Sequence, residues 1–300
     1  MQASTSHTEI NPFVDAHAHF WDPTRLSYPW LAEVPAIAAP HTPEHFIAEA
    51  AELPAHIVFV QAECDRAHFL DEVQWIAELA EREPRLAGIV AFAPMDGGAQ
   101  TAATLNELAS VSLVRGVRHP IQGEGDGSFC LRPEFVAGVQ SLGERELTFD
   151  ICVTHDQLPA AVELVRRCAD TMFVLDHAGK PAIRDHLLDP WRSSIEQLAR
   201  LPNVMCKLSG LVTEAAVPWG EADLEPYVRH LLGTFGPTRL MFGSDWPVVK
   251  LAASYARWLA TVRSLLSHLS DDERRAVFLE NARRCYRLPS SKTTSDIGVI

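Results

Sequence analysis

MFVLDHAGKP, residues 172–181, is an apolar run that ends in two polar residues and then a glycine and a proline. The run has the length of a buried strand, and Gly179 with Pro181 predicts a sharp turn after it. The flanking segments 155–170 and 191–201 carry apolar residues at helical spacing, and Pro202 ends the second of them. An apolar strand between amphipathic helices predicts a parallel sheet covered by helices.

The same unit of strand, turn and helix recurs along the whole chain in both directions from this stretch. Successive predicted strands begin 25 to 43 residues apart, which leaves room for a helix and two loops. The predicted strands are 13–19, 56–63, 86–94, 113–119, 147–153, 172–177, 203–209 and 239–245. Eight such units close most naturally into a (β/α)8 TIM barrel.

Helical periodicity also predicts helices at 71–83 and at about 253–268, and an extra helix over 271–286 packed on the barrel. No linker divides the chain, so we expect one domain over 1–300. Its N-terminus (about 1–11) and its polar tail (about 289–300) are expected to be flexible.

Composition narrows the class of protein further. The 300 residues include 26 Lys and Arg against 39 Asp and Glu, a formal net charge of −13, which disfavours binding to nucleic acid or to an anionic membrane. The first residues lack a basic and then apolar signal pattern, and no apolar run is long enough to span a bilayer. Six scattered cysteines without a CxxC pair favour reduced core thiols. A cytoplasmic protein is therefore expected.

Functional side chains of such a barrel come from the carboxyl ends of its strands. His17 and His19 end the first predicted strand and, two residues apart, point to the same side. His177 ends the sixth and Asp245 ends the eighth. Imidazoles can bind a divalent metal or polarise a carbonyl, and a carboxylate facing them can take a proton from water. Because neighbouring strand residues face opposite sides, Asp176 is expected to support His177 rather than to point inward beside it.

Charged side chains at other strand ends suggest contacts with a substrate. Arg118 follows the fourth strand and could clamp a carboxylate or hydroxyls, whereas Arg115 better suits a surface salt bridge. Glu63 could bind a metal, a substrate hydroxyl or a salt-bridge partner. Lys207 lies inside an apolar run, where a lysine is either paired or functional. Asp150 is open between a structural and a catalytic role.

These strand ends, in this order, resemble the amidohydrolase superfamily, and most closely its amidohydrolase-2 branch of sugar-lactone and pyrone-lactone hydrolases. The resemblance spans about residues 13 to 288. The HxH motif alone is weak evidence for this family, but several sequence runs taken together are specific for it. They are DAHAHFWD (15–22), YPWL (28–31), QAE (61–63), VRH (117–119), LDHAGKP (175–181), KLSG (207–210) and GSDWP (243–247).

The resemblance implies a lactone hydrolase similar to the L-fuconolactone hydrolases, with the L-rhamnonolactone hydrolases close behind. It implies Asp245 as the base toward water, and His17, His19 and His177 as groups that stabilise the oxyanion directly or through a metal ion. Arg118, Glu63 and Lys207, with Trp21, Trp30 and Trp246, would form the pocket for a small-molecule sugar lactone.

Two departures from the wider superfamily bear on the metal. The fourth strand lacks the lysine that many members carboxylate, and the fifth lacks their metal-binding histidine. The resemblance therefore implies at most one divalent ion, zinc first, bound by His17, His19, His177 and Asp245, and leaves metal-independent catalysis open.

Other functions stay open at this point. They include hydrolysis of a pyrone dicarboxylate or a sulfomuconolactone, metal-dependent decarboxylation, and a non-catalytic binding barrel. A homo-oligomer is also left open.

Overall fold

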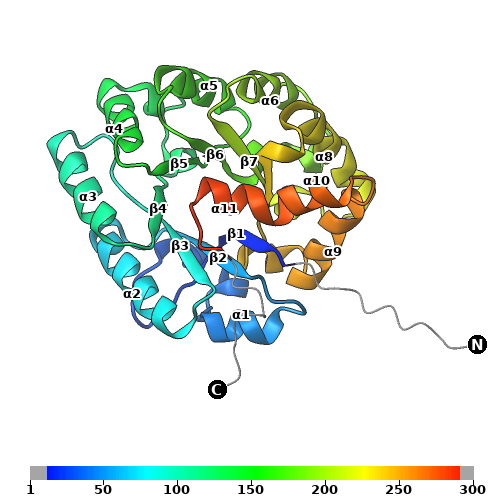
Figure 1. The fold of residues 1–300 in the computed structure, drawn as a ribbon, viewed down its shortest axis with the longest axis horizontal. Helices are drawn as coiled ribbons and strands as arrows, with labels where there is room; N and C mark the ends of the chain where they lie inside the picture. The colour runs from blue at the N-terminus through cyan, green and yellow to red at the C-terminus, as the bar shows by residue number, and fades with distance from the viewer. Residues whose placement is uncertain (1–11, 291–300) are drawn as a thin grey trace, which may run out of the picture.

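The computed structural model describes residues 12–290, and eight parallel strands form its centre. Each strand pairs with the next in chain order, as Figure 1 shows. The strands are β1 Val14–Ala18, β2 His56–Val60, β3 Leu86–Ala91, β4 Val114–Val117, β5 Thr148–Ile151, β6 Phe173–Leu175, β7 Val204–Leu208 and β8 Leu240–Phe242. The predicted TIM barrel with its eight strands is therefore confirmed.

The ring closes at the carboxyl end of β1, against the residues that follow β8. Asp245 donates its backbone N–H to the carbonyl of His17 at 2.8 Å, and His19 donates its own to the carbonyl of Trp246 at 2.7 Å. We call this pair of hydrogen bonds the seam. It brings the polar residues that follow the last strand against those that end the first.

Helices surround the strands on the outside of the ring (Figure 1). They are α1 Pro43–Glu49, α2 Phe69–Arg82, α3 Ala99–Ser110, α4 Pro133–Gly143, α5 Leu158–Arg167, α6 Trp191–Ala199, α7 Leu211–Glu214, α8 Glu221–Phe235 and α9 Tyr255–Leu265. Their apolar stripes face the strands: in α2, Val73, Ile76 and Leu79 are buried. This coat of helices explains why the strands are apolar on both faces.

The predicted extra helix forms from α10 Asp271–Arg275, a π-helical segment Ala276–Glu280, and α11 Asn281–Cys285. It lies across the end of the barrel where the strands begin, visible in Figure 1 as the orange and red helix. Leu279, Ala282 and Tyr286 pack with inward residues of the strands, among them Val14 and Val58, in one buried cluster. Because this end is plugged, access to the interior comes from the carboxyl ends of the strands.

The predicted strand bounds were too long, mostly at the carboxyl ends. β6 stops at Leu175, and the polar residues after it form a 3₁₀ turn in which His177 and Ala178 have φ values of 50° and 52°. The regular hydrogen bonding of β6 ends just before His177, because this candidate site residue lies in a turn at the carboxyl end of the strand.

All six cysteines are buried and free, as expected of core thiols. Within residues 12–290, no helix has the length and apolar character that crossing a bilayer requires. The flexibility predicted for 1–11 and for 291–300 concerns residues outside the described range.

Candidate active site

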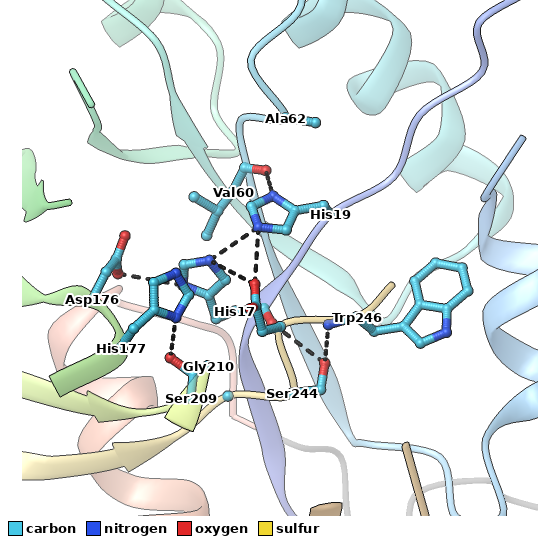
Figure 2. A network of polar contacts seen from close by, with 12 residues as sticks. His17, His19, Val60, Ala62, Asp176, His177, Ser209, Gly210, Ser244 and Trp246 are labelled. Carbon is cyan, nitrogen blue, oxygen red and sulfur yellow. Dashed lines mark hydrogen bonds and ion pairs between the residues drawn. The ribbon is translucent and has the colours of Figure 1, made fainter. Parts of the chain in front are cut away.

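The four predicted catalytic side chains meet at the seam of the barrel, as Figure 2 shows for the histidines. His19 Nε2 lies 3.1 Å from His17 Nε2 and 3.3 Å from Asp245 Oδ1. His17 Nε2 lies 3.7 Å from the same carboxylate oxygen, and the His17 and His177 rings have centroids 4.5 Å apart. The first, sixth and eighth strands thus deliver one compact group of imidazoles and a carboxylate.

The buried carboxylate of Asp15 fixes the backbone on both sides of the seam. Its Oδ1 accepts the backbone N–H of Ser244 at 2.8 Å and that of His17 at 3.2 Å, so one buried carboxylate holds both sides of the seam. Gly243 is required here, because a Cβ at this position would lie 2.7 Å from the Cβ of His17. Burial raises the pKa of Asp15 to about 6.

Both Asp176 and His177 reach the centre, contrary to the expectation that only one would. Asp176 Oδ1 lies 3.3 Å from His17 Nδ1, while the His177 ring packs against the His17 ring. The alternation rule fails because His177 lies in the left-handed region, outside the strand. Gly210 (φ +62°) sits against the His177 ring, and Ser209 Oγ is 3.0 Å from His177 Nδ1.

Hydrogen bonding fixes which nitrogen of His19 is available. Its Nδ1 lies 2.8 Å from the carbonyl oxygen of Val60, which can only accept, so Nδ1 carries the proton. The lone pair of a neutral His19 is then on Nε2, facing His17 and Asp245.

The two fully enclosed imidazoles and the carboxylate have displaced pKa values. Burial holds the pKa of His17 and of His177 well below the ordinary value, so both rings are neutral at pH 7. Burial alone would raise the pKa of Asp245, but His177 and His19 outweigh it and keep that pKa below its usual range. The site therefore holds neutral imidazoles beside an ionised carboxylate, the state in which nitrogen can bind a metal and oxygen can accept a proton.

These residues fit a divalent metal ion. Among the described residues, one atom each of His17, His177 and Asp245 lie within 4.8 Å of one another, and all three side chains are buried. Two imidazole nitrogens and a carboxylate oxygen form a donor set typical of zinc. Asp176 Oδ1, 3.3 Å from His17 Nδ1, has the position of a carboxylate that would orient His17 if the histidine bound a metal. His19, the fourth predicted ligand, lies outside this group of three but next to two of its members.

Lys207, predicted to contact substrate, lies instead in a buried charge cluster below the site. Its Nζ is 2.6 Å from Asp150 Oδ2, 2.9 Å from Asp176 Oδ1 and 3.2 Å from His17 Nδ1. The hydroxyl of Tyr286 donates to Asp150 at 2.7 Å. The side chain is fully buried and paired, so the prediction that it lines the pocket was wrong. Asp150 is held in the same way and belongs to this cluster.

A cavity of about 250 Å³ opens above the histidines at the carboxyl ends of the strands. Its wall includes His19, His177 and Asp245 and, of the predicted contact residues, Glu63, Arg118 and Trp30. Arg118 is nearly buried: one guanidinium nitrogen donates to the Gln61 carbonyl at 2.6 Å, and another lies 3.4 Å from Asp176 Oδ2.

Two predicted wall residues, Trp21 and Trp246, lie behind the wall instead. Both are 0% exposed and absent from the cavity lining. The indole N–H of Trp21 donates to the carbonyls of Ile37 and Ala39 (both 3.1 Å), and that of Trp246 donates to Glu49 at 3.0 Å. Their N–H groups are satisfied internally and their rings pack in the core, so they shape the pocket only from outside.

Four polar residues that the sequence did not single out complete the wall: Gln122, Lys180, Thr213 and Glu214. Lys180 directly follows the HAG turn and donates to Gln122 at 2.6 Å. Its place in the LDHAGKP run was a signal that could have found it. Gln122 lies in a 3₁₀ turn after β4 and Glu214 ends the short helix α7 after β7, where no strand pattern fixes the direction of a side chain.

Comparison with known proteins agrees with this architecture. The amidohydrolase family model matches residues 14–288. The chain is 39% identical over 293 residues to an L-fucono-1,5-lactonase from Burkholderia multivorans, covering 92% of this chain and 96% of the other. It is 31% identical over 283 residues to an L-fucono-1,5-lactonase from Burkholderia ambifaria, covering 92% and 95%.

A solved structure gives the same result in three dimensions. An amidohydrolase from Burkholderia multivorans, crystallised with bound zinc, superposes with a TM-score of 0.83 at 37% identity over 93% of this chain and all of that one. With a family model that covers nearly the whole chain, and with relatives of this identity and coverage, the chain belongs to the amidohydrolase family.

Proposed function

We propose that this protein hydrolyses the ring ester of a sugar-acid lactone, with an aldonolactone of the L-fucono-1,5-lactone type as the first candidate. The observation that carries the proposal is the floor of the cavity, where the Asp245 carboxylate lies beside His19 and close to the neutral imidazole of His17. The names of the two Burkholderia relatives support the same substrate class.

Lactone hydrolysis requires a water made nucleophilic and a carbonyl made electrophilic. Asp245, ionised and held near His19 and His17, accepts the proton of the attacking water. Ring N–H groups of the neutral histidines can donate to the oxygen that becomes negative. Where zinc is bound by His17, His177 and Asp245, with His19 beside them, it supplies Lewis acidity to the carbonyl and lowers the pKa of the water.

The wall of the cavity suits a neutral ring with several hydroxyls. It combines two cations, Arg118 and Lys180, with two acidic residues, Glu63 and Glu214. A dianionic lactone would place its charges near the Glu63 carboxylate, at a cost that a polyol avoids. Trp30, whose N–H donates to the Ala62 carbonyl at 2.9 Å, offers an indole to the C–H face of a sugar.

A panel of lactones in weakly buffered pH indicator tests the proposal, since ring opening releases one acid equivalent. We expect aldono-1,5-lactones to exceed pyrone dicarboxylate and sulfomuconolactone in kcat/KM by roughly 10²-fold. Asp245→Asn should lower kcat by roughly 10²-fold or more. The proposal is refuted if the dianionic lactones are hydrolysed as well as the sugars, or if Asp245→Asn keeps the wild-type rate. Release of CO₂ from an aromatic acid without lactone turnover would favour a decarboxylase.

A further inference from the structure

The segment after β7 runs from the catalytic centre straight to the cavity wall. Ser209 contacts His177, Gly210 packs against the His177 ring, and the single turn of α7 ends at Glu214. Glu214 therefore stands one helical turn from a residue that touches a catalytic histidine. It lines the same cavity as Asp245, but it comes from the loop of a different strand.

The Glu214 side chain is partly buried and has no partner among the described residues. It is only partly exposed, and no side chain or backbone group of residues 12–290 makes a hydrogen bond or salt bridge with its carboxyl group. A carboxyl group in such a place is costly to keep charged unless a ligand supplies a partner. Burial raises its pKa, an effect that Asp245 reinforces and that Lys180, His155 and Arg184 oppose.

Ring opening needs a second proton transfer besides the one from water. When the bond between the carbonyl carbon and the ring oxygen breaks, the oxygen leaves as an alkoxide unless a proton reaches it at that moment. Asp245 takes the water proton beside His17 and His19, and these contacts hold it at one end of the cavity. A second acidic side chain in the same cavity could supply the proton to the ring oxygen without Asp245 having to move.

We propose that Glu214 is the general acid of the reaction and gives its proton to the leaving ring oxygen. Water oxygen bonds to the carbonyl carbon, its proton passes to Asp245, the bond from carbon to ring oxygen breaks, and the ring oxygen takes the proton of Glu214. Solvent then carries the proton of Asp245 away and reprotonates Glu214, so that one water is consumed and one hydroxy acid formed. This assignment rests on the proposed lactonase function.

The leaving group provides a direct test. Glu214→Gln keeps the shape of the side chain and removes its acidic proton. We expect kcat on an aldono-1,5-lactone to fall by roughly 10²-fold or more, because an alkoxide leaves poorly without protonation. On dihydrocoumarin, whose phenolate leaves readily, kcat should change by less than about threefold, because a good leaving group needs little acid catalysis.

The pH profile is the second readout and needs only the sugar lactone. Wild-type kcat should fall on the alkaline side as the acid loses its proton, and Glu214→Gln should lose this alkaline limb. Glu214→Asp, which retains a carboxyl group, should keep the limb and part of the activity. Glu134→Gln, on the exposed first turn of α4, is the matched control and should behave as wild type.

The other possible results distinguish the role of Glu214 from the proposed function. Equal losses on both lactones, no loss at all, or an alkaline limb that persists in folded Glu214→Gln would overturn the role of Glu214 alone. A wild-type protein that is inactive on every aldonolactone would instead refute the proposed function. Thermal unfolding of each variant verifies that the substitution leaves the fold intact.

Discussion

At the scale of single residues, two lysines differ in their surroundings: one is buried in ion pairs and the other lines the cavity. Lys207 sits in a strand and is neutralised by Asp150 and Asp176 below the site, whereas Lys180 sits in a turn and reaches the cavity. The sequence allowed Lys207 to be either paired or functional, and burial decided for pairing. A lysine inside an apolar strand is thus better interpreted as half of an ion pair than as a substrate contact.

Lys207→Met should destabilise the fold. The substitution leaves two buried carboxylates without their ammonium, and breaking a buried pair on one side costs roughly 3–5 kcal/mol. Adding Asp150→Asn to the same chain should recover part of the loss, because one of the two charges is removed with its partner. Urea unfolding measures both. Unchanged stability together with a higher KM would indicate instead that Lys207 contacts the substrate.

Glu72 should make stability depend on pH. This carboxylate of α2 is buried and accepts the backbone N–H of Ala62 at 3.2 Å, and burial raises its pKa from 4.5 to about 8. The folded state keeps the proton up to about pH 8, while the unfolded chain releases it near pH 4.5. Stability therefore falls as pH rises through this window, by on the order of 5 kcal/mol.

Glu72→Gln carries the same hydrogen-bond acceptor without the ionisation. Its unfolding free energy should vary less between pH 5 and pH 8 than that of the wild type, so the two proteins diverge most at the alkaline end. The test is urea unfolding across this pH range. Parallel curves for the two proteins would mean that Glu72 ionises in the folded state as it does in water.

At the scale of elements, periodicity located all eight strands but not the conformations that follow them. The orientation of Trp21 depends on carbonyls of the loop after β1, and that of Trp246 depends on Glu49 of α1. No local sequence pattern reveals these partners. The left-handed backbone at His177 likewise lies beyond strand alternation. The histidines and Asp245 were found because strand ends in a barrel converge, whereas Glu214 depends on the short helix α7.

The turn that joins β7 to α7 should tolerate no side chain at Gly210. Its φ is +62°, and a Cβ would lie 2.5 Å from His177 Nδ1. Gly210→Ala should displace the His177 ring and lower kcat by roughly tenfold or more, since small misplacements of catalytic groups are costly. Gly233→Ala in α8, where nothing lies within 4 Å, is the control and should keep kcat and gain up to about 1 kcal/mol. Equal kcat in the two variants would show that His177 need not be held in place.

At the scale of the whole molecule, one metal site would tie together three strands that are far apart in the sequence. His17 follows from β1, His177 from β6 and Asp245 from β8. A ligand that binds only the folded ring stabilises it, by about 4 kcal/mol at a thousandfold excess over Kd.

Zinc should therefore raise the melting temperature of the chelator-treated protein, and by less in Asp245→Asn, which has lost a carboxylate ligand. Calorimetry with graded zinc measures the shift, and metal analysis should give at most about one ion per chain. Two tightly bound ions, or identical shifts in the wild type and the variant, would contradict the single site of His17, His177 and Asp245.

The seam has a consequence for how the protein is made on the ribosome. His17 and His19 leave the exit tunnel with the first strand, but Asp245 and Trp246, to which they bind through the backbone, arrive with the last. Chains emerge N-terminus first, so the edge of β1 that meets the residues after β8 stays unpaired for most of the synthesis, although its other edge can pair with β2 early. The three proposed metal ligands cannot meet until translation has passed Asp245. A polypeptide that is interrupted before this residue would therefore lack both the proposed base and the proposed metal site.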